Sequence, residues 1–159
     1  MQTTTRHFPA EVLLVEDNPD DVLLTKRGFA SCPYSVRVHH VENGRDCLAF
    51  LRKEGSFSAA PTPDLVLLDL NMPVMNGREV LSAIAADERL KRLPIIILST
   101  SNAEQDIEEM YRLCCNSYVI KPVDYDDFEA TLERISEYWL DTALLPSKPS
   151  EISGEASDC

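Results

Sequence analysis

Five short, mostly apolar runs divide this chain, and longer segments separate them. The run from 65 to 68 is Leu-Val-Leu-Leu between two aspartates, which indicates a strand buried on both faces of a parallel sheet. The first intervening segment opens with Asn18 as helix N-cap and Pro19 in the first helical position. Alternating strands and helices predict an α/β fold, a doubly wound five-stranded parallel sheet with right-handed crossovers. The predicted strands are 11–16, 36–41, 64–69, 94–99 and 117–121, and the predicted helices are 19–31, 43–53, 76–86, 102–113 and one from 124 onward.

Polar side chains stand where four of these strands end. Glu16 and Asp17 end the first strand, Asp69 the third, Ser99 the fourth and Lys121 the fifth. In open α/β sheets, ligands bind beyond the carboxyl ends of the strands, so we expect these groups to meet. Clustered carboxylates repel one another unless a cation lies among them, and oxygen ligands suit Mg²⁺. The lysine and the hydroxyl would face phosphoryl charge, which predicts phosphoryl transfer onto Asp69.

The same residues carry a family resemblance over about residues 10–140. Glu16-Asp17, Asp69, Ser99 and Lys121, in this order, resemble the receiver domain of two-component response regulators. The resemblance implies a flavodoxin-like sheet with strand order 2-1-3-4-5. It also implies that Asp69 accepts a phosphoryl group from a phosphohistidine on a sensor histidine kinase.

The resemblance further implies a role for each residue of the pocket. Mg²⁺ is the implied cofactor, for which Mn²⁺ or Ca²⁺ can substitute in a crystal. Its implied ligands are Glu16, Asp17, Asp69 and the backbone carbonyl of Asn71. Ser99 and Lys121 are the implied contacts of the phosphoryl oxygens, and Tyr118 is the implied aromatic switch that moves together with Ser99.

Five segments resemble one subgroup, the small regulators paired with phytochrome-type histidine kinases. They are 18–22, 49–52, 77–81, 98–101 and 138–140. The resemblance implies a phytochrome kinase as partner and a homodimer built from the fourth helix, the fifth strand and the fifth helix. No residue pattern in the chain by itself indicates a role in light sensing.

The fifth helix is longer than this fold requires. Phe128, Leu132, Ile135 and Trp139 follow helical spacing and predict its buried face. The apolar residues beyond that face are expected either to form a dimer surface or to fold back on their own domain. The predicted dimer residues are Tyr138, Leu140, Leu144 and Leu145. We expect an N-terminal tail at 1–9, the receiver domain at 10–145 and a disordered polar tail, with no output domain, at 146–159.

Composition excludes several other classes of protein. The chain has 159 residues, 44% hydrophobic and 26% charged, which fits one soluble globular domain. A net charge of −12 disfavours nucleic acid, whose phosphates require a basic footprint. No apolar run is long enough to cross a membrane or to form a signal peptide, so we expect a cytoplasmic protein.

The cysteines and histidines suggest no further chemistry. Five scattered cysteines lack disulfide or metal spacing and are interpreted as small apolar residues in a reducing compartment. The neighbours Cys114 and Cys115 should point to different faces. His39 and His40 lie on opposite faces of a strand and are expected to be solvated.

Two alternatives to a phosphoacceptor switch remain open. An adaptor could keep the fold without phosphorylation, although the intact acidic pocket argues against this. A haloacid-dehalogenase-type phosphohydrolase would also use an aspartyl nucleophile, but it needs a second acid where Asn71 stands. We therefore expect no enzyme activity beyond self-directed phosphoryl transfer and autodephosphorylation. A nucleotide-binding protein is weaker still, because a glycine-rich phosphate loop is missing.

Overall fold

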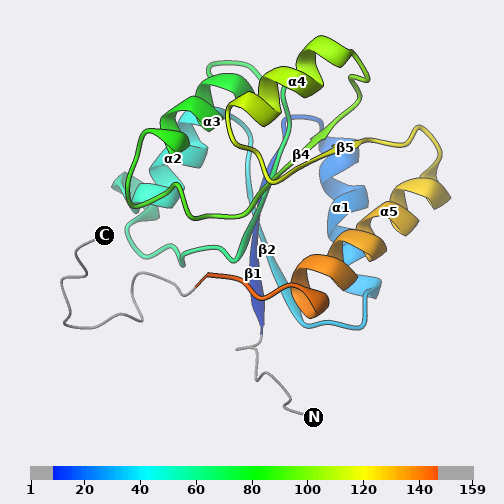
Figure 1. Ribbon diagram of the computed structural model, residues 1–159. Helices are drawn as coiled ribbons and strands as arrows, with labels where there is room; N and C mark the ends of the chain where they lie inside the picture. The colour runs from blue at the N-terminus through cyan, green and yellow to red at the C-terminus, as the bar shows by residue number, and fades with distance from the viewer. Residues whose placement is uncertain (1–8, 147–159) are drawn as a thin grey trace.

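The computed structural model describes residues 9–146 and contains one parallel sheet of five strands. The strand order is β2-β1-β3-β4-β5, which confirms the predicted fold class and topology (Figure 1). The strands are β1 (Ala10–Val15), β2 (Val36–Val41), β3 (Leu65–Leu68), β4 (Ile95–Ser99) and β5 (Ser117–Ile120). The helices are α1 (Pro19–Ser31), α2 (Gly44–Arg52), α3 (Gly77–Ala85), α4 (Glu104–Arg112) and α5 (Tyr125–Glu137), with short η1 (Gly55–Phe57) and η2 (Tyr138–Thr142). Predicted element boundaries agree to within two residues wherever a boundary was predicted.

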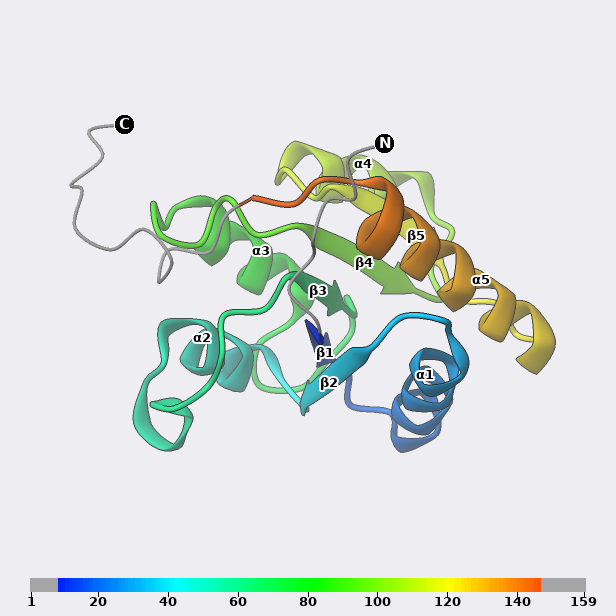
Figure 2. The same cartoon turned by 90° about the horizontal axis from the view of Figure 1, so that it is seen from below.

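Helices cover both faces of the sheet (Figures 1 and 2). α1 and α5 lie on one face, where Phe29, Phe128 and Leu132 are buried against the strands. α2, α3 and α4 lie on the other face, over a second apolar cluster. All four residues of β3 are fully buried because the strand lies in the middle of the sheet between these layers. This is the burial that its uninterrupted apolar sequence predicts.

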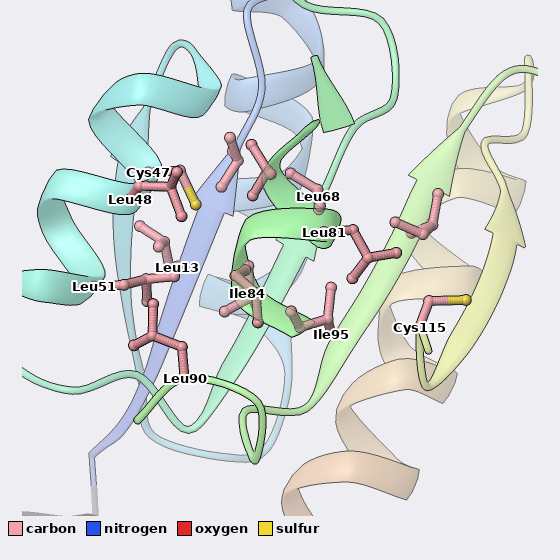
Figure 3. Close-up of a cluster of buried hydrophobic side chains, with 14 of the residues drawn as sticks. Leu13, Cys47, Leu48, Leu51, Leu68, Leu81, Ile84, Leu90, Ile95 and Cys115 are labelled. Atoms are coloured by element: carbon pink, nitrogen blue, oxygen red, sulfur yellow. The ribbon is translucent and has the colours of Figure 1, made fainter. Parts of the chain in front are cut away.

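The cluster beneath α2 and α3 is the larger of the two cores (Figure 3). Leu13 of β1, Leu68 of β3 and Ile95 of β4 meet Leu81 and Ile84 of α3. Burying one such side chain contributes roughly 2 kcal/mol, so the cluster holds the strands rigidly in register. A rigid sheet fixes the positions of the side chains that follow its strands.

Four helices begin with a side-chain N-cap, at the edge of the sheet where the predicted site lies. Asn18 Oδ1 accepts hydrogen bonds from the backbone N–H of Asp20 and Asp21 at 2.9 and 3.4 Å. Each cap satisfies backbone donors that the first helical turn leaves without a partner. The other caps are Asn43 for α2, Asn76 for α3 and Asp124 for α5.

The end of α2 provides a stability prediction. Lys53 caps the helix in the left-handed conformation, with φ 57° and ψ 47°. A Cβ disfavours this conformation, and glycine adopts it without strain. Lys53→Gly is therefore expected to raise the free energy of unfolding by roughly 1 kcal/mol in urea titrations. Lys53→Ala keeps the Cβ and serves as control. An equal gain in both variants would mean that the lysine side chain, and not the backbone, is the cause.

The end of α5 corrects one predicted dimer residue. The α-helix stops at Glu137 and a π-helical turn follows from Tyr138 to Thr142. Leu140 is only 1% exposed and packs into the core beneath α1 and α5, so it belongs to its own domain. The fold-back alternative is thus correct for this residue, which continues the buried series of Leu132 and Ser136 at four-residue spacing. Tyr138 and Leu144 are exposed and Leu145 is half-buried.

The face of α5 agrees with its apolar spacing. Phe128, Leu132 and Ile135 are buried, and Trp139 is half-buried against the same cluster. The predicted tails at 1–9 and 146–159 lie, except for Pro9 and Pro146, outside the described residues. None of the helices within 9–146 has the length and apolarity that a bilayer crossing demands.

The two strand histidines are not solvated as the sequence suggested. His39 Nε2 lies 2.5 Å from Glu11 Oε2, and His40 Nε2 lies 2.7 Å from the backbone oxygen of Glu16. Both rings are half-buried, and the His39 ring also packs against Phe50 of α2, with ring centroids 5.5 Å apart. The adjacent cysteines do diverge, since Cys114 is exposed and Cys115 is buried.

Candidate functional site

Three carboxylates meet at the carboxyl edge of the sheet. Glu16 and Asp17 follow β1, and Asp69 follows the neighbouring strand β3. Carboxylate oxygens of all three lie within 4.8 Å of one another. Glu16 and Asp69 are buried, whereas Asp17 is exposed. The pairing of β1 with β3 thus brings together acids that are more than fifty positions apart in the sequence.

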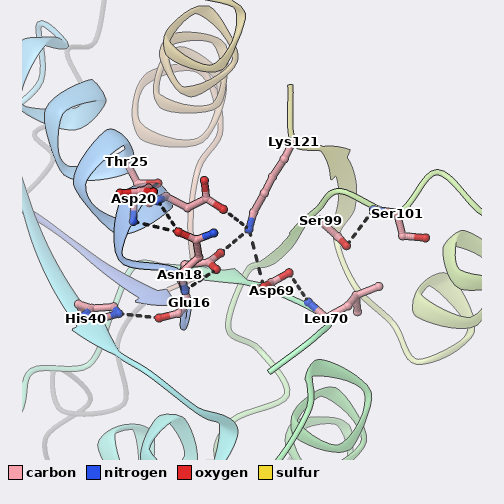
Figure 4. A network of polar contacts seen from close by, with 11 residues as sticks. Glu16, Asn18, Asp20, Thr25, His40, Asp69, Leu70, Ser99, Ser101 and Lys121 are labelled. Carbon is pink, nitrogen blue, oxygen red and sulfur yellow. Dashed lines mark hydrogen bonds and ion pairs between the residues drawn. The ribbon is translucent and has the colours of Figure 1, made fainter. Parts of the chain in front are cut away.

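Lys121 supplies the positive charge beside these acids (Figure 4). Its Nζ lies 2.5 Å from Glu16 Oε2, 3.0 Å from Asp21 Oδ2 and 3.7 Å from Asp69 Oδ2. The side chain is 5% exposed, so the ammonium has exchanged water for carboxylates. The last strand therefore places a buried cation at the acids delivered by the first and third strands.

The two oxygens of Asp69 have different surroundings. Oδ1 accepts a hydrogen bond from the Leu70 backbone N–H at 2.8 Å. Oδ2 faces Lys121 at the longer distance of 3.7 Å. The hydrogen bond from the Leu70 N–H orients the carboxylate, and Oδ2 is the oxygen directed at the lysine (Figure 4).

Burial and charge compete in this pocket. Loss of water raises the pKa of Glu16 to about 7, although the hydrogen bond from Lys121 opposes the shift. Burial likewise raises the pKa of Asp69. Burial disfavours the charged form of Lys121 too, but the hydrogen bond to Glu16 and the charge of Asp69 outweigh it and raise the pKa of the lysine. The pocket therefore holds two carboxyl groups with raised pKa values beside a charged lysine, and a further cation would favour their ionised forms.

A second polar network begins at Ser99, at the end of β4. Ser99 is fully buried, while its neighbour Thr100 is exposed. Ser99 Oγ accepts a hydrogen bond from the Ser101 backbone N–H at 3.2 Å. Tyr118 is half-buried, and its hydroxyl donates to the Ser101 carbonyl at 2.8 Å. The serine hydroxyl and the tyrosine ring are therefore connected through a single loop residue.

That loop is tied to α4 and α3 as well. Ser101 Oγ donates to Asp106 Oδ2 at 2.5 Å, and Arg78 of α3 pairs with Asp106 and Glu109 of α4. Displacement of the β4–α4 loop would therefore act on both helices.

One pocket residue is missing from the set predicted from the sequence. Asp21 lies in the first turn of α1, where an acid favours the helix N-terminus, and its Oδ2 also accepts a hydrogen bond from Lys121 Nζ. Its place in the first turn, four residues after Asp17, was the available signal. Asn71, by contrast, lies exposed in the loop after β3.

The donor set of the pocket fits a hard divalent cation. Glu16, Asp17 and Asp69 offer oxygen atoms only, which suit Mg²⁺ or Mn²⁺ better than softer metals. A divalent cation would also favour the ionised forms of these carboxylates, whose pKa values burial raises.

Fold and site together define a flavodoxin-like α/β protein with an acidic, lysine-containing pocket at the carboxyl edge of its sheet. Residues 12–133 match the response regulator receiver domain, and the chain belongs to that family. It is a signalling protein of the two-component type, and receiver domains bind a divalent metal.

Individual relatives agree with this assignment. The probable methanogenesis regulatory protein FilR2 of Methanothrix harundinacea (strain 6Ac) is 40% identical over 133 residues, which is 83% of this chain and 84% of FilR2. The response regulator Rcp1 of Synechocystis sp. (strain ATCC 27184 / PCC 6803 / Kazusa) is 35% identical over 139 residues, 87% of this chain and 95% of Rcp1.

Two solved structures show the same fold. The phosphorylated cyanobacterial phytochrome response regulator RcpA superposes with a TM-score of 0.84 at 42% identity, over 87% of this chain and 99% of RcpA. The Mn²⁺-bound form of Rcp1 gives 0.83 at 35% identity, over 87% of this chain and all of that one. One of these relatives is thus known with a phosphoryl group and the other with a divalent metal.

Proposed function

We propose that Asp69 accepts a phosphoryl group from a sensor histidine kinase and thereby switches a protein–protein interface. The observation that carries this proposal is the meeting of Asp69, Glu16, Asp17 and Lys121 at one edge of the sheet. Glu16, Asp17, Asp69 and the carbonyl of Asn71 would hold Mg²⁺. The ion would neutralise charge that develops on the transferring phosphoryl group.

The proposed transfer uses the residues as follows. Asp69 Oδ2 attacks the phosphorus, a new O–P bond forms, and the P–N bond to the kinase histidine breaks, leaving its electron pair on the imidazole. Oδ1 stays on the Leu70 amide and keeps the carboxylate oriented. Lys121 lies on the Oδ2 side, where its charge can stabilise phosphoryl oxygens.

The proposed switch starts from Ser99. Its hydroxyl turns toward the phosphoryl oxygens, and the hydrogen bond that Ser99 Oγ accepts from the Ser101 backbone N–H breaks. Ser101 in turn holds Tyr118 and Asp106, so the loop, the tyrosine and α4 would move together. A local change in charge would thus reach the surface of α4, β5 and α5.

The proposed partner is a phytochrome-type histidine kinase. It is supported by the likeness to RcpA, a cyanobacterial phytochrome response regulator, and to a response regulator in red light signalling of R. palustris. FilR2 has similar identity and a name from methanogenesis, so a non-phytochrome kinase is the competing outcome. Because such kinases draw on cytoplasmic ATP, we propose a cytoplasmic location.

A homodimer through α4, β5 and α5 is also proposed. Tyr111, Ile120 and Tyr125 are exposed apolar side chains on these elements. Tyr138 and Leu144, also exposed, and Leu145 extend the same proposal beyond α5. Exposed apolar side chains gathered on neighbouring elements are typical of interaction sites.

The test is intact-mass spectrometry of the full chain after incubation with acetyl phosphate and Mg²⁺. We expect an acid-stable, base-labile addition of one phosphoryl group, absent in EDTA. Borohydride reduction followed by peptide mapping should locate it at Asp69. No addition would favour the adaptor, and catalytic turnover of phosphomonoesters would favour the phosphohydrolase.

A further inference from the structure

Lys121 is held by a carboxylate that lies outside the proposed metal ligands. An ammonium has three N–H donors, and two short hydrogen bonds leave Nζ, to Glu16 Oε2 and to Asp21 Oδ2. Asp69 Oδ2 stands further away, at 3.7 Å. Among the residues that the structure describes, these are the carboxylates that pair with Lys121. Two donors are thus anchored, and the third is available toward Asp69.

Asp21 is itself well fixed. Its backbone N–H donates to Asn18 Oδ1 at 3.4 Å, and its backbone oxygen accepts from Thr25 Oγ at 2.7 Å. Thr25 is buried in α1. The Asp21 carboxylate therefore projects from a helix turn held on both sides, and it reaches Lys121 from an element that lies across the pocket from β4.

A lysine needs such anchors more than an arginine would. Its ammonium is a compact charge on a flexible four-carbon chain and has no planar shape to orient it. Glu16 serves as anchor in the structure, but it is also a proposed metal ligand. Asp21 is not one of the three acids whose oxygens cluster within 4.8 Å, so its contact with Lys121 does not compete with metal ligation.

We propose that Asp21 is a positioning residue for phosphoryl transfer, which holds the Lys121 ammonium so that its remaining donor meets the phosphoryl group on Asp69. This inference rests on the proposed function. It predicts that removing the Asp21 carboxylate slows phosphorylation, whereas the loss of a negative charge alone would speed it. Removing a negative charge near the pocket should speed the encounter with an anionic phosphodonor, whereas losing the anchor should slow the transfer.

The experiment compares two neighbouring acids in the full chain. Asp20 occupies the same turn, its side chain is exposed, and its backbone N–H also donates to Asn18. Phosphorylation by acetyl phosphate in Mg²⁺ is followed by intact mass for wild type, Asp21→Ala, Asp21→Asn, Asp20→Ala and Asp20→Asn. Lys121→Met and the double variant Lys121→Met/Asp21→Ala complete a double-mutant cycle.

We expect Asp21→Ala to slow phosphorylation about tenfold, and Asp21→Asn to slow it less because the amide oxygen still accepts a hydrogen bond. Both Asp20 variants should react as fast as wild type or faster. In the Lys121→Met background, Asp21→Ala should cause no further slowing, since the residue acts through the lysine. Mn²⁺ affinity should change less than about threefold in Asp21→Ala and much more in Asp17→Asn.

Three results would overturn the inference. Asp21→Ala could match Asp20→Ala, which would make Asp21 a surface charge only. It could slow phosphorylation equally with and without Lys121, or it could weaken Mn²⁺ as strongly as Asp17→Asn. A wild-type chain that gains no phosphoryl group on Asp69 would overturn the proposed function as well, and so distinguishes the two failures. Far-UV circular dichroism shows that each variant is folded, and Asp21→Asn preserves the test if the alanine variant unfolds.

Discussion

Asp69→Asn is expected to abolish phosphorylation and, at the same time, to make the folded protein more stable. An amide is not a nucleophile at neutral pH, so the phosphoryl addition should fall below detection, at least about a hundredfold. The amide oxygen can still accept the Leu70 N–H, so the local geometry is kept. The gain in stability comes from removing a buried carboxylate, whose charged form is disfavoured by the loss of water.

The stability gain should depend on pH. Burial raises the pKa of Asp69 above its ordinary value of 3.8, so the folded protein holds this proton more tightly than the unfolded chain. Ionising Asp69 therefore costs folding free energy as pH rises above 3.8, and asparagine escapes that cost. In EDTA, Asp69→Asn should exceed wild type by on the order of 1 kcal/mol at pH 8 and by less at pH 5.

Asp64→Asn is the matched control for this prediction. Asp64 precedes the same strand, and its Oδ2 accepts the Glu11 backbone N–H at 2.7 Å, far from the pocket. We expect it to phosphorylate at the wild-type rate. Urea unfolding at both pH values and intact-mass spectrometry measure the two effects. An Asp69→Asn variant that is less stable than wild type at pH 8 would show that the contact with Lys121 outweighs the cost of burying the charged carboxylate.

Gly77→Ala is expected to be the most destabilising small substitution at this site. Gly77 begins α3 against the end of β3, where its N–H donates to the Leu70 carbonyl at 2.9 Å. A Cβ there would overlap the Asp69 carbonyl oxygen and lie 2.9 Å from Leu70 Cα. These are backbone atoms in the buried centre of the sheet and cannot rotate away. We expect a loss of roughly 3 kcal/mol in unfolding free energy.

The same substitution should also slow phosphorylation, because relief of the overlap requires the backbone of Asp69 to move. Gly55→Ala is the control. Gly55 has a positive φ of 58° but open space around its Cβ position, so it should cost only about 1 kcal/mol and leave phosphorylation unchanged. Equal losses in the two variants would mean that steric overlap at Gly77 is relieved without strain. Thermal and urea unfolding give the stabilities, and intact mass gives the rates.

The sequence by itself determined the class of fold and most of the pocket. The apolar run Leu65–Leu68 indicated a strand buried on both sides. The strand ends pointed to Glu16, Asp69 and Lys121, because parallel strands share one carboxyl edge. Gly77 and the caps Asn18 and Asn76 carry local signals that need no distant partner. Short-range patterns of this kind depend on backbone geometry alone.

Only the tertiary structure decided which distant groups touch. Asp21 meets Lys121 across a hundred positions, a contact that the strand-end pattern does not predict. His39, which the sequence suggested to be solvated, meets Glu11 on the neighbouring strand. Leu140 lies in the core, although the sequence placed it on the dimer surface. Such pairings depend on how long side chains and helix ends pack in three dimensions, where burial selects one partner among several that the sequence leaves equally available.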